Sequence, residues 1–371
     1  MKLVYLTSKT YPQTTADHFF VLEMARAFAA FLHENFLLVV RNEYSTGVGN
    51  IPHYSFGLNI IKGKLLFYFF RLPFFIIRKK FFGRDTVFFT NDVHLLRVLF
   101  FWKKILRFKY QVVSDWHMLF GSKNEKDIIQ KSDGCVTTTK HLKDLMVSRY
   151  GVPESKILVA YGGVDLDLFG KITETSEVLR KRLNLPESAF LVGYVGFYKT
   201  MGMSKGIDTM IRALALIEDE SIKMVFVGGR PKEMEEYQKL AEEKGVSERS
   251  FFVPVVFPEA VALYEKAIDA LVIPYPDKPH FCEYGFPMKA YEYLASKKPI
   301  IFSNLPIIAE VMGDCAISFN PDDAKDLSEK IIEIKNFPER TIERVASAYE
   351  KAQECTWKAR AEKIIDYAKT L

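Results

Sequence analysis

Cysteine is scarce in this sequence, and its placement excludes two kinds of site. Four cysteines occur in 371 residues, and they stand far apart at positions 135, 282, 315 and 355, without a CxxC spacing. Neither a disulfide framework nor a zinc site built on paired cysteines is predicted. This pattern is typical of a protein in a reducing compartment, and we expect a cytoplasmic location.

Long apolar runs are missing as well. The most apolar window, Leu65 to Ile77, is interrupted by Arg71 and Pro73. It is also shorter than the about 20 residues that a membrane-spanning helix needs. The apolar run that follows Lys2 is too short for the core of a signal peptide. We therefore expect neither a transmembrane helix nor secretion.

What is present has the length and composition of two globular domains. Hydrophobic residues make up 49% and charged residues 26% of the chain, which is ordinary for a folded protein. Short apolar runs alternate with helical patterns, and this predicts α/β domains with mostly parallel sheets. A charged stretch, Lys171 to Asn184, separates two such halves. We expect domains at 1–170 and 171–345, and a final helix at 346–371 that either caps the second domain or packs on the first.

The apolar runs also predict the individual elements. A helix is expected from Asp17 to Leu32, where Phe20, Met24 and Phe28 recur at helical spacing. Strands are expected in the first half at 2–7, 36–41, 86–90, 111–115 and 134–138. In the second half they are expected at 191–195, 223–227, 251–255, 270–273, 299–302 and 316–319.

A turn and a helix start stand together between Gly285 and Ala295. Gly285 suits a turn and Pro287 suits the first helical position, so a helix should begin near Pro287. The unpaired amides at a helix start favour a phosphate group. Glu292, a turn and a half later, then has the place to accept hydrogen bonds from a ribose. The alternative is a solvated glutamate on an ordinary helix.

The run Pro-Met-Lys-Ala-Tyr-Glu-Tyr-Leu-Ala from Pro287, followed by Lys-Lys-Pro-Ile-Ile, closely resembles the donor-binding helix of the retaining family-4 glycosyltransferases. These enzymes have the GT-B fold, two Rossmann-like domains that face each other across a cleft. The resemblance implies that Glu292 binds the ribose of a nucleotide-sugar donor. It also implies that the diphosphate and sugar are held by the turn before the helix, at Gly285, Phe286, Pro287 and Met288.

Further segments resemble the same family. Glu283 is similar to an acidic residue that contacts the donor hexose, although it lies nine positions before Glu292 where many members have eight. Ser204-Lys205-Gly206 resembles the helix start at which a lysine clasps the diphosphate, so a catalytic role is implied for Lys205. The usual arginine after Gly196 is replaced by Phe197, and either Lys199 substitutes for it or one phosphate contact is missing.

Other positions carry weaker implications. Val255 ends a strand that receives the nucleotide base in relatives, although a plain core strand explains it equally well. Ser114-Asp-Trp-His117 resembles an acidic-x-His motif, which implies that His117 contacts the transferred hexose or the acceptor; a lone histidine is usually structural. A glycine-rich loop is missing at 11–18, and Asp17 is expected to cap the following helix.

The resemblance implies a hexose transfer with retention of anomeric configuration, from UDP- or GDP-hexose to a hydroxyl of a glycan or a lipid-linked acceptor. The leaving diphosphate would help to deprotonate that hydroxyl, so neither a metal ion nor a cofactor is expected. Positioning and charge neutralisation by Lys205 would then do the physical work. A non-catalytic binding or scaffold protein of the same fold is the alternative, and a nucleotide-sugar epimerase is a weaker one.

One segment is both basic and aromatic. Lys62 to Lys109 contains 12 Lys or Arg and two Asp, a net charge of +10, together with many Phe and Leu. Helices of this composition suit an anionic membrane surface, such as the inner face of the cell membrane. Two core helices with basic outer faces are the alternative. Nucleic-acid binding is not expected, because no recognised motif is present.

Overall fold

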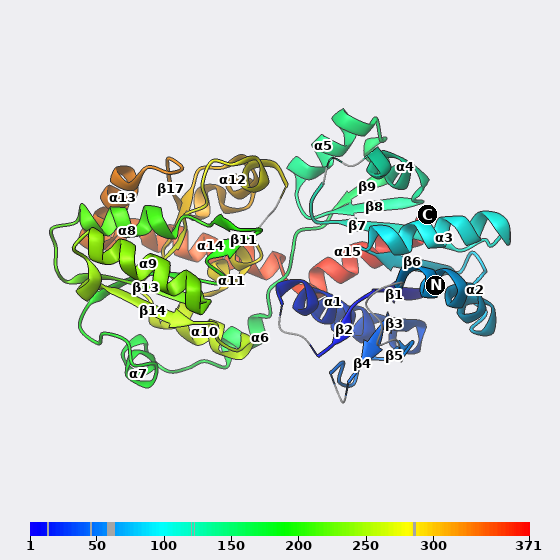
Figure 1. The fold of residues 1–371 in the computed structure, drawn as a ribbon, viewed down its shortest axis with the longest axis horizontal. Coiled ribbons are helices and arrows are strands. Elements are labelled where there is room, and N and C mark those ends of the chain that lie inside the picture. Colours follow the sequence, from blue (N-terminus) through cyan, green and yellow to red (C-terminus); the bar gives the residue numbers. More distant parts are fainter. Residues whose placement is uncertain (13–14, 45–46, 58–63, 120, 122, 285–286) are drawn as a thin grey trace. The chain divides into compact units, whose positions relative to one another are not determined.

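The computed structural model describes residues 1–371 apart from 13–14, 45–46, 58–63, 120, 122 and 285–286. The chain divides into two compact units, drawn in Figure 1. Unit 1 comprises Met1–Tyr161 and Trp357–Leu371, and unit 2 comprises Gly162–Thr356. The first junction thus lies before the expected boundary at 170, and the second lies after the expected boundary at 345. Each unit is described by itself below.

Unit 1 is built on a seven-stranded parallel sheet. The strand order is β5(His53–Ser55), β3(Phe36–Val40), β1(Lys2–Leu6), β6(Thr86–Thr90), β7(Gln111–Trp116), β8(Gly134–Thr137) and β9(Ile157–Val159). The central strands are almost wholly buried, because helices cover both faces of the sheet. These helices are α1(Ala16–Leu32), α2(Lys64–Arg78), α3(Val93–Ile105), α4(Lys123–Lys131), α5(Lys140–Tyr150) and α15(Trp357–Lys369).

The final helix, α15, belongs to unit 1 although it ends the chain. It lies beside α1, where the ring of Trp357 meets the rings of Phe19 and Phe20 at centroid distances of 6.4 and 5.2 Å. Its buried face is apolar apart from Arg360. Within the described part of the chain, none of the helices combines the length and the apolar content that crossing a bilayer requires.

Unit 2 repeats the plan with a six-stranded parallel sheet. The strand order is β14(Ser250–Pro254), β13(Ile222–Gly229), β10(Phe190–Val195), β15(Ala270–Ile273), β16(Ile300–Ser303) and β17(Ile317–Phe319). Its longer helices are α8(Ile207–Ala215), α9(Pro231–Glu243), α10(Pro258–Ala267), α13(Ala324–Asn336) and α14(Ile342–Glu354). A short hairpin, β11(Lys199–Thr200) and β12(Met203–Ser204), precedes α8, and the seven-residue α11(Lys289–Ala295) precedes β16.

Both sheets have a switch point, a place where later strands are added on both sides of the first strand. In unit 1, β1 lies between β3 and β6, and in unit 2, β10 lies between β13 and β15. The connections leave such a pair of strands in opposite directions, and open α/β sheets bind ligands outside the carboxyl ends of these strands. The two switch points are therefore the places to look for a site.

Candidate functional site

The switch point of unit 2 is a place of close backbone contact. Gly206, at the start of α8, has φ +87°, and a Cβ there would lie 1.7 Å from the carbonyl oxygen of Pro274 after β15. Gly228, at the end of β13, has φ +105°, and a Cβ there would lie 2.6 Å from the carbonyl oxygen of Gly196. Only glycine fits these positions. The ends of three strands and the start of α8 are thereby drawn together.

Two lysines lie at this junction. The Lys205 side chain is half-buried, with its Nζ 5.9 Å from the centroid of the Tyr275 ring. Burial lowers the pKa of Lys205 to about 8, against the opposing charge of Glu233. Lys289 opens α11, and its Nζ lies 3.4 Å from the centroid of the Tyr194 ring. Burial and the charge of Lys205 hold the pKa of Lys289 well below its ordinary value.

The amine of Lys289 is aimed at the end of β10. A Cβ at Gly196 would lie 2.5 Å from the Lys289 Nζ, so the amine occupies the space that the missing side chain leaves. Among the described residues, this Nζ has no hydrogen-bond partner although it is buried. A buried amine that lacks an acceptor in the described part of the chain, with the charge of a second lysine nearby, forms a candidate site for an anion.

Two carboxyl groups accompany the lysines. Glu292, on α11, is half-buried, and burial raises its pKa against the opposing charge of Lys289. Glu265, on α10, is fully buried, and neither of its carboxyl oxygens has a partner among the described residues. Burial and the charge of Glu292 raise the pKa of Glu265 well above its ordinary value. The predicted ribose ligand Glu292 thus lies in the same electrostatic environment as Lys289.

The structure places the other residues of the predicted turn as follows. Pro287 and Met288 directly precede α11, so the helix begins close to where the sequence predicts it. The side chain of Met288 also lies close to Gly162, where a Cβ would be 3.2 Å from the Met288 methyl carbon. Glu283 lies in a short π-helical turn, His280–Tyr284. Gly285 and Phe286, both predicted donor ligands, lie outside the described residues.

Lys199 and Val255 contact other parts of unit 2, namely α9 and the end of β13. The Lys199 Nζ lies 2.5 Å from the carboxylate of Glu236 on α9. Lys199 lines a pocket of about 470 Å³ between the hairpin, α8 and α9. Val255 is about half exposed after β14, and its N–H donates to the Gly229 carbonyl at 3.2 Å.

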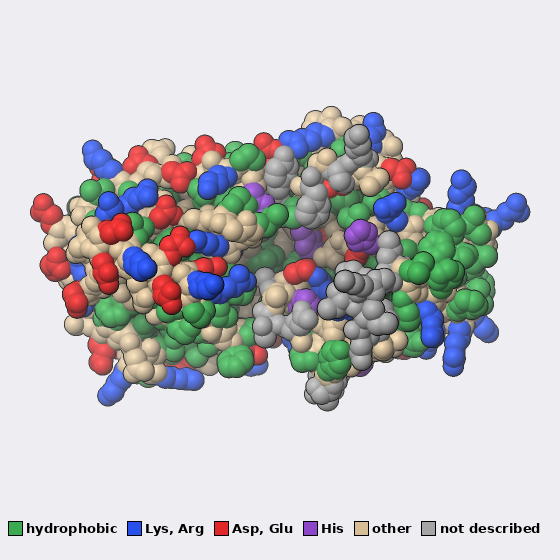
Figure 2. All heavy atoms as spheres, in the orientation of Figure 1, with side chains coloured by type: hydrophobic (Ala, Val, Ile, Leu, Met, Phe, Trp, Pro, Cys, Tyr) green, Lys and Arg blue, Asp and Glu red, His purple; other side chains and the backbone are tan. Residues whose placement is uncertain are grey.

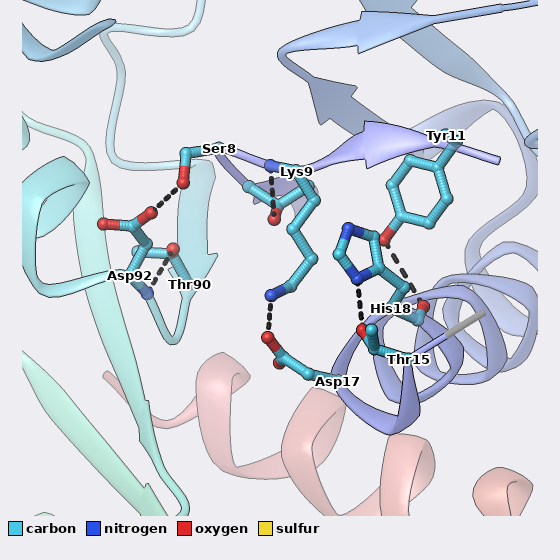
Figure 3. A network of polar contacts seen from close by, with 9 residues as sticks. Ser8, Lys9, Tyr11, Thr15, Asp17, His18, Thr90 and Asp92 are labelled. Atoms are coloured by element: carbon cyan, nitrogen blue, oxygen red, sulfur yellow. Dashed lines mark hydrogen bonds and ion pairs between the residues drawn. The ribbon is translucent and has the colours of Figure 1, made fainter. Parts of the chain in front are cut away.

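The switch point of unit 1 holds a pocket of about 530 Å³. It is lined by Thr7, Lys9, Asp17, Asn91, Asp92, Val93, His94, Asp115, Trp116, His117, Met118 and Glu125. Figure 3 shows polar contacts at its rim: Ser8 donates to Asp92, and Lys9 pairs with Asp17. The expectation that Asp17 caps α1 is wrong, because Thr15 is the cap and Asp17 lies in the first turn. The side chain turns to Lys9 instead.

His117 lies in this pocket as the end of a buried chain of contacts. Its Nε2 is 2.9 Å from Asp115 Oδ2, and Asp115 Oδ1 accepts from Arg360 Nη2 at 2.7 Å. The side chains of Arg360 and Asp115 are 1% and 0% exposed. Burial alone would raise the pKa of Asp115, but Arg360 and His117 together bring it below its ordinary value. The carboxylate therefore stays charged and fixes the imidazole.

Sequence reasoning missed Arg360 and Lys289. Arg360 stands 245 positions from Asp115, and its signal in the sequence is an arginine on the otherwise apolar face of the last helix. In the sequence, Lys289 is one residue of the motif that resembles the donor-binding helix, and the motif gives it no role of its own. A lysine between two apolar residues, Met288 and Ala290, near the predicted helix start is the signal that could identify it.

Comparison with known proteins shows which proteins this chain is similar to. Residues 175–354 match the family described as "Glycosyl transferases group 1". The chain is 25% identical over 261 residues to the D-inositol 3-phosphate glycosyltransferase of Thermomonospora curvata, covering 65% of this chain and 58% of that protein. It is 27% identical over 215 residues to the O-antigen chain mannosyltransferase RfbU of Salmonella typhimurium, covering 57% and 53%. The chain thus spans little more than half the length of these curated relatives.

Solved structures resemble the whole chain. A glycosyltransferase from Rickettsia africae has a TM-score of 0.80 at 15% identity, covering 100% of this chain and 98% of that one. Anabaena Alr3699/HepE in complex with UDP has a TM-score of 0.79 at 16% identity, with both chains fully covered. The predicted GT-B fold is confirmed by these structures, and residues 175–354 are similar to the group 1 glycosyltransferases.

Proposed function

We propose that this protein is a retaining family-4 glycosyltransferase that moves a hexose from UDP- or GDP-hexose to an acceptor hydroxyl, without a metal ion or a cofactor. The observation that carries the proposal is the group of charged side chains around Lys289 in unit 2, with Lys205 at the switch point and Glu292 on the same helix as Lys289. A lysine amine neutralises the charge that develops on the leaving diphosphate. The group 1 domain and the UDP complex of Alr3699/HepE agree with this donor class.

The remaining residues take positioning roles in the proposal. Glu292 accepts the ribose hydroxyls, Glu283 contacts the hexose, and Val255 faces the base. The turn at 285–288 holds the diphosphate and sugar, with Lys199 as a further phosphate contact if it leaves Glu236. In unit 1, His117 meets the acceptor, and Asp115 keeps its ring in one orientation. Such fixed orientation lowers the barrier by positioning the reactants.

The ribose role of Glu292 can be tested with matched ligands. Titration calorimetry should show that the protein binds UDP or GDP more tightly than the 2′-deoxy form. Glu292→Ala should stay folded, lose affinity for the ribonucleotide by about tenfold or more, and lose the preference for the 2′-hydroxyl, because charged hydrogen bonds contribute about 1.5–3 kcal/mol. Glu259→Ala, on the exposed side of α10, is the control. Unchanged binding in Glu292→Ala would count against the proposal.

Transfer itself separates an enzyme from a non-catalytic binding protein of the same fold. Incubation with radiolabelled UDP- and GDP-hexoses should release free nucleoside diphosphate, and release should rise when an extract of glycans and lipid-linked sugars is added. The anomeric configuration of the product then tests retention. Tight binding without turnover under these conditions would favour the non-catalytic alternative.

A second part of the proposal concerns the basic aromatic segment. On α2, Leu66, Phe70, Phe74 and Ile77 are 63, 56, 72 and 50% exposed, and their spacing places them on one face. Figure 2 shows hydrophobic side chains gathered beside Lys and Arg side chains at this end of unit 1. The core-helix alternative does not account for a bulky apolar stripe that faces solvent.

The apolar face continues from α2 to α3. The rings of Phe69 and Phe101 lie 4.8 Å apart, and the Trp102 indole donates to the Phe69 carbonyl at 2.7 Å. Phe101 and Ile105 of α3 are themselves 44 and 56% exposed. With the net charge of +10 in the sequence from Lys62 to Lys109, we propose that this face rests on an anionic membrane such as the inner face of the cell membrane. A lipid-linked acceptor would be reached there.

Vesicle co-sedimentation tests this surface. We expect binding to vesicles that contain phosphatidylglycerol and much weaker binding to phosphatidylcholine alone. Phe70→Ser/Phe74→Ser should reduce the bound fraction several-fold, because each exposed ring buries apolar area in the interface. Leu216→Ser, an equally exposed apolar residue of unit 2, is the control. Equal binding of both vesicle types, or no effect of the double variant, would contradict membrane association.

A further inference from the structure

The loop after β10 lacks the basic residue that its resemblance to family-4 enzymes leads one to expect. Phe197 stands directly after Gly196, with the guanidinium carbon of Arg230 5.2 Å from the centroid of its ring. The Phe197 carbonyl accepts from the Tyr194 hydroxyl at 2.8 Å. Lys199, the nearest lysine in sequence, is bound to Glu236. Residues 197–199, all described by the structure, therefore bring no free cation to Gly196.

A cation reaches the same place from another element. The Lys289 Nζ comes from α11 and lies where a side chain at Gly196 would begin. It packs against the face of the Tyr194 ring, an arrangement that favours the charged amine. Gly196 leaves the space open, and the close approach of Gly228 to its backbone keeps the strand end in place.

Lys289 is buried, and the hydrogen-bonding capacity of its amine is unused within the described part of the chain. The side chain is only 8% exposed, and its Nζ has no hydrogen-bond acceptor among the described residues. A buried unpaired amine is costly, and an aliphatic residue would fill this helix position without that cost. The charged groups around it are Lys205, Glu292 and Glu265. The Glu265 carboxyl is buried as well, and it has no hydrogen-bond partner in the part of the chain that the structure describes.

We propose that Lys289 is the second cationic ligand of the donor diphosphate and takes the place of the basic residue that position 197 lacks. The inference rests on the proposed function, because it assigns a ligand within the same donor site. The diphosphate accepts hydrogen bonds from Lys205 and Lys289 together, and its charge removes the repulsion between the two amines. Lys289 thus recognises the diphosphate and not the nucleoside.

A nucleoside series tests this assignment. Affinities for uridine, UMP and UDP, or the guanosine series if the protein prefers it, are measured for Lys289→Met. We expect UDP affinity to fall about 10- to 100-fold, the range for a lost charged hydrogen bond, while uridine affinity stays within twofold. Lys289→Arg should retain part of the UDP affinity. Lys239→Met, an exposed lysine of α9, is the charge-matched control and should behave as the wild type.

The outcomes separate the two proposals. If the wild type binds neither UDP nor GDP, the proposed function fails. If Glu292→Ala weakens UDP binding but Lys289→Met does not, only the role of Lys289 is overturned. A parallel loss of uridine affinity and thermal stability in Lys289→Met would show that the residue is structural, and would overturn the role as well. Should that variant not fold, Lys289→Met/Glu265→Gln removes both buried ionisable groups and carries the same test.

Discussion

The two switch points present polar side chains at equivalent places in their sheets. The two sites differ in whether these side chains have hydrogen-bond or ion-pair partners. In unit 1 the charged groups of the pocket have partners within the unit: Ser8 with Asp92, Lys9 with Asp17, and Asp115 with both Arg360 and His117. In unit 2, Lys289 and Glu265 are buried without a hydrogen-bond partner among the described residues. The side chains of the unit 1 pocket are thus held in place by contacts within the unit, whereas we propose that a ligand supplies the missing contacts of the unit 2 site. We expect unit 1 to be sensitive to the loss of a partner and unit 2 to ligand charge.

The largest effect should come from breaking the buried ion pair of unit 1. Arg360→Met leaves Asp115 charged and buried, which should lower the free energy of unfolding by about 3–5 kcal/mol. Tryptophan fluorescence during urea unfolding measures it, because all three tryptophans, Trp102, Trp116 and Trp357, belong to unit 1. Lys363→Met, on the exposed side of α15, is the control.

The pH dependence of that effect identifies its cause. Arg360 and His117 hold the folded pKa of Asp115 below its ordinary value, so their contribution is present above the unfolded pKa of about 3.9. It is lost as pH falls through the folded pKa. The difference between the wild type and Arg360→Met should therefore shrink in acid. A difference that is as large in acid as at pH 7 would indicate lost packing and not a lost charge partner.

The next effect concerns the backbone contacts that shape the unit 2 site. Gly206→Ala places a methyl group against the Pro274 carbonyl, whereas Gly245→Ala, also at positive φ (+71°), meets nothing within 4 Å. Gly245→Ala should lower the free energy of unfolding by about 1–2 kcal/mol, because alanine is disfavoured in the left-handed backbone conformation. Gly206→Ala should cost clearly more and should also weaken UDP binding. Thermal unfolding followed by circular dichroism, with and without UDP, checks both; equal costs would mean that the close approach is unimportant.

A smaller effect should appear in the pH dependence of diphosphate binding. The pKa of Lys205 is lowered to about 8, and the charged amine is the form that binds an anion. Diphosphate affinity should therefore fall as pH rises through about 8, by about tenfold between pH 7 and 9. Titration with UDP measures this, and uridine at the same pH values controls for the base. A Lys205→Met variant that keeps the same slope would contradict the assignment.

The sequence predicts the elements of both units better than their contacts. The expected strands at 86–90 and 270–273 coincide with β6 and β15, because apolar runs flanked by turn residues mark buried parallel strands. The pattern of the last helix shows which face is buried, but not that this face meets α1. For the same reason the pairing of Arg360 with Asp115 was not predictable. The motif around Glu292 predicts a donor site, but only the fold shows that Lys289 reaches Gly196.

The smallest effect should come from the exposed ion pair at the rim of the unit 1 pocket. The side chain of Asp17 is 57% exposed where it pairs with Lys9, whereas Asp115 is fully buried. Solvent screens the exposed pair, so Asp17→Asn should lower the free energy of unfolding by less than about 1 kcal/mol, and 0.5 M salt should remove the difference. Tryptophan fluorescence again measures unit 1. If Asp17→Asn lowered the free energy of unfolding about as much as Arg360→Met does, burial would not determine how strongly a contact stabilises this pocket. The exposed pair at the rim would then stabilise the pocket as much as the buried contacts of Asp115 with Arg360 and His117.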